Sequence, residues 1–285
     1  MDLSLDAIAL LCATGFAAGF VDAIAGGGGL LTIPAMLLAG IPPVAAVATN
    51  KVQGTLSIIS ALYTYNRSGI VEWRAGIPMA AMSFSIGIGG ALSVHILPKE
   101  AIAALIPALL IAVALYFGLI RGLGDADRKS RITRMAFILL VVPPIAFYDG
   151  FLGPGAGSFY ALALIALQGF GITRTTAMSK LLNGGSNAGS LLLFTLAGSV
   201  IWPLGLGMGL FSMLGAQLGS RLAIKQGARI IRPLIVLTCC ALSVRMLMDP
   251  TNPAHIFLVN LWFLGRRTLT PNAEAVINPA TQGLT

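Results

Sequence analysis

Two lysines stand inside long apolar stretches of the chain. Lys51 lies within the apolar segment of residues 44–66, and Lys180 lies within that of residues 175–197. A lysine at the centre of a membrane-spanning helix costs at least about 2.5–3.5 kcal/mol on insertion scales, so such residues usually serve a function. The alternative is snorkelling, in which the long side chain carries its ammonium group to the membrane interface. We favour a functional role, in which both lysines supply positive charge to an anion.

Polar side chains gather around both lysines and could orient the oxygens of an anion. Lys180, Asn183 and Asn187 are spaced by three and four residues, so they share one face of a helix. The other interpretation is that Asn and Ser join neighbouring helices by hydrogen bonds, and both uses can coexist. The candidate substrate ligands beside the lysines are Thr49, Asn50, Gln53, Asn183, Ser186 and Asn187.

Two glycine-rich clusters, residues 26–29 and 153–158, each precede an apolar segment of about 13 residues. A helix of that length extends about 20 Å, against about 30 Å for the hydrocarbon core of a bilayer. If the short end is the N-terminus, free N–H groups and the positive end of the helix dipole point into the protein and favour an anion. Plain helix packing is the alternative. The candidate ligands in the clusters are Gly27, Gly28, Gly29, Gly155, Gly157 and Ser158.

Asp22 and Asp149 stand next to the two glycine clusters. A carboxylate at such a place could carry a coupling proton or cap a helix. The sequence does not choose between these roles, and both residues are candidates for proton coupling.

Other kinds of chemistry have weaker support. An intramembrane hydrolase would need Ser158 as nucleophile and His95 or His255 as base, and both histidines are expected far from Ser158 in depth. The three cysteines have no metal-ligand spacing. We therefore expect no catalytic residue, no metal and no cofactor. A passive anion channel with the same polar pathway remains an alternative to a transporter.

The composition is that of a membrane protein. Of 285 residues, 56% are hydrophobic and 10% charged, with a mean hydropathy of +0.89, whereas soluble domains are roughly 25% charged. The apolar runs are continuous rather than alternating, which favours helices over a barrel. The net charge of +8 comes from Lys and Arg in short loops, so the expected partner is the lipid bilayer and not a nucleic acid. The sequence predicts an all-α polytopic membrane protein and leaves a homodimer open.

The chain matches itself at an offset of 129 residues. Lys51 falls on Lys180 and Trp73 on Trp202. Such repeats build many secondary transporters, with the substrate site near the midplane where the halves meet. The predicted organisation is a first repeat (1–121), a basic linker (122–133), a second repeat (134–250) and a tail, partly interfacial and partly loose (251–285). Further matched pairs are Ala48 and Ala177, Ser57 and Ser186, Gly69 and Gly198, Ser83 and Ser212, and Gly90 and Gly219.

Each half contains five apolar segments, and an odd number inverts the second copy relative to the first. The segments are 5–22, 28–40, 44–66, 75–96 and 101–120, then 135–152, 156–169, 175–197, 203–221 and 233–248. Equivalent loops carry opposite amounts of Lys and Arg, as inversion requires. The positive-inside rule then places the linker in the cytoplasm and the N-terminus outside. A four-segment half with a re-entrant 28–40 ranks second.

The motif Gly19-Phe20-Val21-Asp22-Ala23-Ile24-Ala25-Gly26-Gly27-Gly28-Gly29 is followed by Ile33-Pro34 and Ala48-Thr49-Asn50-Lys51. With its glycine-rich second copy at residues 153–157, this pattern resembles the sulfite exporter TauE/SafE family, also called the toluene sulfonate uptake permeases. The likeness extends to about residue 250. It implies transport of sulfur oxyanions or organosulfonates across the bacterial inner membrane without a bound cofactor. The residues by themselves argue only for alternating-access transport of a small anion.

Overall fold

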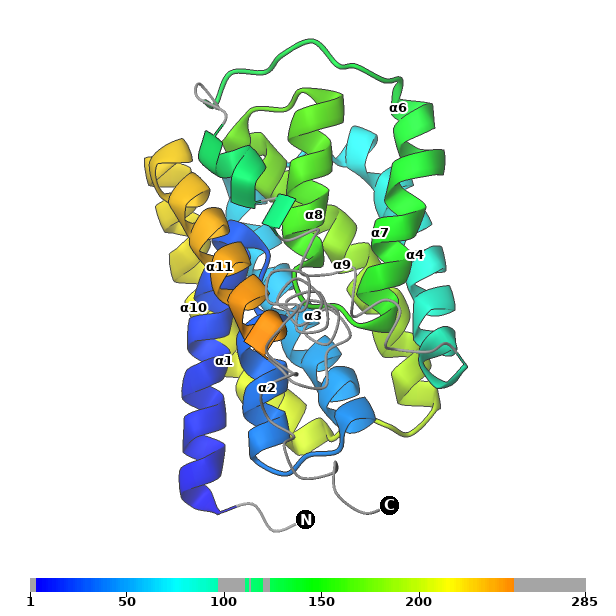
Figure 1. Ribbon diagram of the computed structural model, residues 1–285, viewed down its shortest axis with the longest axis vertical. Coiled ribbons are helices and arrows are strands. Elements are labelled where there is room, and N and C mark those ends of the chain that lie inside the picture. Colours follow the sequence, from blue (N-terminus) through cyan, green and yellow to red (C-terminus); the bar gives the residue numbers. More distant parts are fainter. Residues whose placement is uncertain (1–3, 97–110, 113, 120–123, 249–285) are drawn as a thin grey trace, which may run out of the picture.

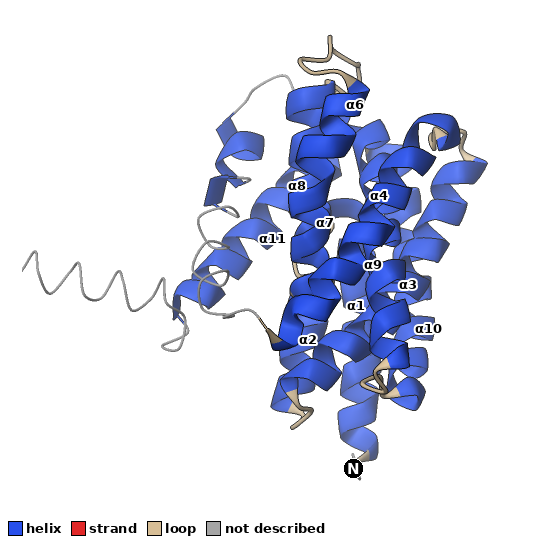
Figure 2. Ribbon diagram, turned by 90° about the vertical axis from the view of Figure 1, so that its right-hand side faces the viewer, coloured by secondary structure: helices blue, strands red, loops and turns tan. Residues whose placement is uncertain are grey.

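The computed structural model describes residues 4–96, 111–112, 114–119 and 124–248, and this part of the chain consists of helices and connecting loops (Figure 1). The helices stand side by side in one bundle, as a view turned by 90° also shows (Figure 2). The all-α fold class predicted from the sequence is confirmed. The predicted tail 251–285 and most of the segment 101–120 lie outside the described residues.

Residues 4–96 of the first half form three long helices and one short one. Helix α1 begins after Ser4, whose side chain accepts a hydrogen bond from the Ala7 N–H, and it ends where Gly26 turns left-handed at φ 81°. A short 3₁₀ turn, η1 (Ser93–His95), follows the last of them. The helices are α1 (Leu5–Ala25), α2 (Gly29–Leu38), α3 (Pro43–Arg67) and α4 (Trp73–Leu92).

The second half begins with a helix that contains a π turn. Pro143 and Pro144 lack the N–H groups that would bond the carbonyls of Leu139 and Leu140, so the chain passes through the π-helical η2 there. The elements are α6 (Arg134–Ala136), η2 (Phe137–Val141), α7 (Val142–Phe151), α8 (Ala156–Ala163), η3 (Leu164–Gln168), α9 (Ile172–Leu196), α10 (Trp202–Gln226) and α11 (Ala228–Met248).

The bounds of the helices follow the repeat in the sequence. Helices α3 and α9 begin and end 129 residues apart, and α4 and α10 begin at the same offset, at Trp73 and Trp202. In Figure 1, α1 begins near the N-terminus at the bottom of the view and runs upward, whereas α6 lies at the top and α7 continues from it downward. The helices that begin the two halves therefore run in opposite directions.

The two halves are interlocked. Helix α4 packs mainly against α7 and α9 of the second half, and α10 packs mainly against α1 and α3 of the first half. Glycines permit these close approaches: a Cβ at Gly90 would lie 2.2 Å from the Phe147 carbonyl oxygen, and one at Gly219 would lie 2.4 Å from that of Phe20. The center of the bundle is thus built by both halves together.

Three helices among the described residues are long and apolar enough to cross a membrane: Leu5–Ala25, Trp73–Leu92 and Arg134–Phe151. The apolar runs gave helix ends that differ from the observed ones. Helix α10 continues to Gln226 rather than 221, and α11 begins at Ala228 rather than 233. A helix can continue through charged residues after it leaves the bilayer, so the apolar run is shorter than the helix at that end.

Charged loops meet at one end of the bundle. Arg174, at the start of α9, forms ion pairs with Glu72, which precedes α4, and with Asp127 of the linker. At the ends of α3 and α10, Arg67 and Arg221 line one surface pocket of about 260 Å³. This clustering is what the positive-inside rule expects of a cytoplasmic face. The orientation of the chain in the membrane stays a prediction.

Candidate functional site

The two glycine-rich turns pack directly against each other. A Cβ added at Gly26 would lie 2.5 Å from the carbonyl carbon of Gly157, and one added at Gly157 would lie 2.6 Å from the Gly26 Cα. The Ser158 hydroxyl donates a hydrogen bond of 2.6 Å to the Ala25 carbonyl oxygen. Only residues without a side chain allow this approach, which joins the N-terminal ends of α2 and α8 inside the protein.

Lys51 forms a buried ion pair with Asp149. Its Nζ donates to the Asp149 Oδ1 at 2.9 Å and to the Asp149 carbonyl oxygen at 2.5 Å. Both side chains are 1% exposed. Gly153 leaves room for the ammonium group, because a Cβ there would lie 3.0 Å from Nζ.

Lys180 forms the corresponding pair with Asp22. Its Nζ, on a fully buried side chain, donates to the Asp22 Oδ2 at 2.8 Å. The other oxygen, Oδ1, accepts a hydrogen bond of 3.2 Å from the N–H of Gly28, the residue before α2. The carboxylate of Asp22 therefore takes a place at a helix N-terminus that the sequence analysis assigned to the substrate.

Each ion pair crosses between the halves. Lys51 of α3 bonds Asp149 of α7, and Lys180 of α9 bonds Asp22 of α1. Neither lysine snorkels to the membrane interface, since both ammonium groups end inside the protein. The two positive charges are matched by two negative ones, so these four residues carry no net charge when all are ionised.

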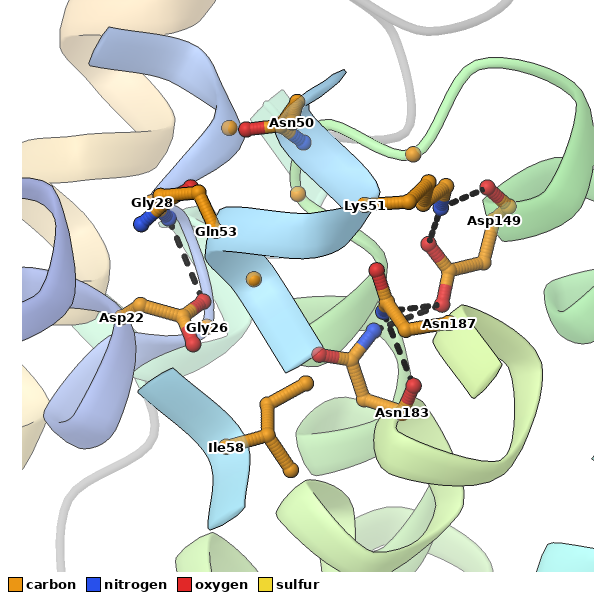
Figure 3. A pocket seen from close by; sticks show the side chains of 14 residues that line it. Asp22, Gly26, Gly28, Asn50, Lys51, Gln53, Ile58, Asp149, Asn183 and Asn187 are labelled. Atoms are coloured by element: carbon orange, nitrogen blue, oxygen red, sulfur yellow. Dashed lines mark hydrogen bonds and ion pairs between the residues drawn. The ribbon is translucent and has the colours of Figure 1, made fainter. Parts of the chain in front are cut away.

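A cavity of about 30 Å³ lies between the two pairs (Figure 3). Figure 3 shows Asp22 and Gly28 on one side and Lys51, Asp149, Asn183 and Asn187 on the other. A space of this size admits water, and a polyatomic anion needs the walls to move apart. The lining residues are Asp22, Gly26, Gly28, Gly29, Asn50, Lys51, Gln53, Gly54, Ile58, Asp149, Gly153, Gly155, Asn183 and Asn187.

Three side chains of α9 support the Asp149 carboxylate. Its Oδ2 accepts hydrogen bonds from Asn183 Nδ2 at 2.6 Å, from Asn187 Nδ2 at 3.2 Å and from the hydroxyl of Ser186. The polar stripe predicted on this helix thus exists and faces the carboxylate. Together with Lys51, it satisfies both oxygens of Asp149.

Asn50 and Gln53 of α3 are held by neighbouring hydroxyls. The Thr32 hydroxyl donates to Asn50 Oδ1 at 2.5 Å, which fixes the amide so that its Nδ2 lies beside Gly29. Gln53 Nε2 donates to the Ser212 hydroxyl of α10. The Asn50 amide nitrogen has no hydrogen-bond acceptor within the described part of the chain and lines the cavity. It is a donor available to a ligand.

Most of the predicted site residues line the cavity, and six do not. Thr49 accepts a hydrogen bond from the Ile201 N–H, and Gly27 faces an apolar pocket beside Thr238. Gly157 and Ser158 form the contact between the glycine turns. Lys180 and Ser186 donate hydrogen bonds to the carboxylates of Asp22 and Asp149, respectively, but do not line the cavity. The lining residues that the sequence analysis missed are Gly26, Gly54, Ile58 and Gly153. Gly54 could have been found, because it is the repeat equivalent of Asn183.

The structure adds nothing in favour of catalysis. The hydroxyl of Ser158 is committed to the Ala25 carbonyl, and His255 lies outside the described residues. Among the described residues there is no group of three or more His, Cys, Asp or Glu side chains that could hold a metal ion.

The bundle and its buried polar centre define a helical membrane protein of the polytopic class. The chain belongs to the sulfite exporter TauE/SafE family, whose model matches residues 11–246. It is 50% identical over 257 residues to the probable membrane transporter protein ORF9 of Sinorhizobium sp, covering 90% of this chain and 98% of that protein.

Two further relatives carry similar names. The probable membrane transporter protein YfcA of Escherichia coli K12 is 45% identical over 81% of this chain and 86% of its own length. A probable membrane transporter protein of Haemophilus influenzae is 39% identical over 87% of this chain and 98% of its own length. No solved structure matches the chain. Family and relatives together identify a membrane transporter.

Proposed function

We propose that this protein is a secondary transporter that moves a small sulfur oxyanion or organosulfonate across the bacterial inner membrane by alternating access. One observation carries the proposal: the central cavity lies where the two halves meet, and each half supplies a lysine whose charge is held by an aspartate of the other half. The family name supplies the sulfur chemistry.

The ion pairs also explain how a site between two halves can open. Separating the halves on one side of the membrane loosens contacts that cross between them, and both ion pairs do so. An anion in the cavity can then bond an ammonium group in place of a carboxylate, with the Gly28 N–H and the Asn50 amide as further donors. The lysines thus act through exchange of partners and not as free charges.

The test is uptake of ³⁵S-sulfite into proteoliposomes by the wild type and by Lys51→Met and Lys180→Met. Methionine keeps much of the length of the side chain and removes the charge. We expect both variants to lose sulfite flux, while Lys225→Met, at an exposed position in the last turn of α10, keeps it. Circular dichroism and size-exclusion chromatography establish that each variant is folded. Wild-type flux in the folded Lys51 and Lys180 variants would refute the role given to them.

The substrate class is tested by thermal shift. Ligands that bind only the folded state raise its apparent stability. Sulfite, thiosulfate, taurine and sulfoacetate are compared with sulfate and with carboxylates, and we expect stabilisation by a sulfur oxyanion or a sulfonate. Stabilisation by carboxylates alone would contradict the sulfur assignment.

A conductance far above the turnover of a transporter would indicate a passive anion channel instead of alternating access.

A further inference from the structure

The buried charges restrict what can enter the cavity. The pairs Lys51–Asp149 and Lys180–Asp22 are neutral in sum, and three of the four side chains are at most 1% exposed. Adding a monovalent anion leaves one uncompensated negative charge in a region of low dielectric, which is strongly unfavourable. Adding the anion together with one proton on a carboxylate keeps the region neutral. Electrostatics therefore favours entry of the two together.

The two carboxylates are not equally suited to accept that proton. Asp149 bonds Lys51, Asn183, Ser186 and Asn187, so its protonated form would face several donors and lose bonds to them. Asp22 bonds Lys180 and the Gly28 N–H, the latter at 3.2 Å. The Asp22 side chain is 12% exposed and that of Asp149 is 1% exposed. Protonation of Asp22 therefore breaks fewer hydrogen bonds than protonation of Asp149, and the Asp22 side chain is more accessible to water.

The repeat locates the origin of this difference in the sequence. The positions that hold Asn183 and Asn187 in the second half hold Gly54 and Ile58 in the first, neither of which can donate from its side chain. Ser57, the equivalent of Ser186, is 1% exposed, and its hydroxyl makes no hydrogen bond with the described residues. The donors that hold Asp149 are therefore absent from the corresponding positions near Asp22.

Few other charged groups surround Asp22. Helix α2 carries none, and the described basic residues of α10 and α11 lie within two turns of a helix end. Tyr65 of α3 donates its hydroxyl to the Ala23 carbonyl. The other helices packed against α1 carry further titratable or charged groups: Lys51, Tyr63 and Arg67 on α3, Arg174 and Lys180 on α9, Tyr160 on α8, and Cys239 and Cys240 on α11.

We propose that Asp22 accepts a proton that enters with the anion. The neutral Asp22 carboxyl no longer pairs with the Lys180 ammonium group or accepts from the Gly28 N–H, and both groups bind the anion instead. The Asp149 carboxylate, which accepts hydrogen bonds from Asn183, Ser186 and Asn187 of α9, stays ionised during the cycle. One proton accompanies one monovalent anion, so that transport moves no net charge and a monovalent sulfonate is preferred to a dianion such as sulfate. This inference rests on the proposed transport function.

The experiment uses ³⁵S-methanesulfonate, which is monovalent throughout the neutral pH range, in proteoliposomes with the membrane potential clamped. With the exterior one pH unit more acidic, one-to-one coupling drives about tenfold accumulation in the wild type, because one pH unit is worth about 1.4 kcal/mol. Asp22→Asn should exchange the anion at equal pH, lose this accumulation and become sensitive to membrane potential. Asp22→Glu, which keeps a titratable group, should retain pH-driven accumulation.

The outcomes separate the two proposals. If the wild type exchanges neither methanesulfonate nor sulfite, the transport function fails and the inference fails with it. If it exchanges the anion but a pH gradient drives no accumulation, transport stands and the coupling proton is refuted. Accumulation that persists in Asp22→Asn and is lost in Asp149→Asn assigns the proton to the other carboxylate and overturns our choice.

A second measurement needs only the wild type, in case Asp22→Asn does not fold. Titration calorimetry of methanesulfonate binding in two buffers of different ionisation enthalpy counts the protons exchanged on binding. At a pH where Asp22 is ionised in the unliganded protein, we expect uptake of one proton per anion. Binding without proton uptake from slightly acid to slightly alkaline pH would refute the coupling.

Discussion

Neutralising both members of the Lys51–Asp149 pair together should cost less stability than the sum of the two single substitutions. Lys51→Met removes two charge-assisted hydrogen bonds, to the carboxylate and to the backbone of Asp149, and leaves a carboxylate that is 1% exposed without its counter-ion. Breaking a buried pair in this way costs about 3–5 kcal/mol. Asp149→Asn likewise leaves the buried Lys51 ammonium group without its counter-ion.

The double variant Lys51→Met/Asp149→Asn buries no uncompensated charge at this position. Its loss of stability should therefore be smaller than the sum of the two single losses by about 0.5–3 kcal/mol, as found for residues in direct contact. The assay is unfolding by SDS in mixed micelles, followed by circular dichroism for all four proteins of the cycle. Additive losses would show that the two charges do not depend on each other and would refute the pairing.

Two other substitutions test the packing and the hydrogen bonds of the site. Ser186→Ala should cost about 1.5–3 kcal/mol of unfolding free energy, because it removes a donor to the Asp149 carboxylate. Ser57→Ala, at the matched position of the other repeat, should cost nothing or stabilise, since its buried hydroxyl has no partner among the described residues. Gly157→Ala should cost about 1–3 kcal/mol by forcing the chain away from Gly26, and the same denaturation assay checks all three. A stable Gly157→Ala protein would contradict the close approach of the two turns.

The helices and the general place of the site could be predicted from the sequence. Long apolar runs fix the helices, and polar residues inside such runs are costly enough to mark the buried centre. The polar stripe of Asn183 and Asn187 on α9 and the two lysines lie where helical spacing places them. The bounds of α3, Pro43–Arg67, differ from the predicted 44–66 by one residue at each end.

The partners of these charges could not be predicted. Lys51 and Asp149 are 98 residues apart in the chain, and Lys180 and Asp22 are 158 apart, so their contact depends on how the halves interlock. The glycine clusters posed the same difficulty, because a run of glycines fits a helix start facing a ligand and also a close contact between backbones. Both uses occur: Gly28 donates its N–H, and Gly157 packs against Gly26.

Locating the bound anion in a crystal structure tests the proposed transport site directly. Selenite, an analogue of sulfite with an anomalous scatterer, can be co-crystallised with the wild-type protein, and the anomalous signal gives the position of selenium. We predict a peak in the cavity between Gly28 and Lys51, within hydrogen-bond reach of the Asn50 amide. A peak confined to the surface pocket of Arg67 and Arg221, with none in the cavity, would contradict an anion site between the two halves.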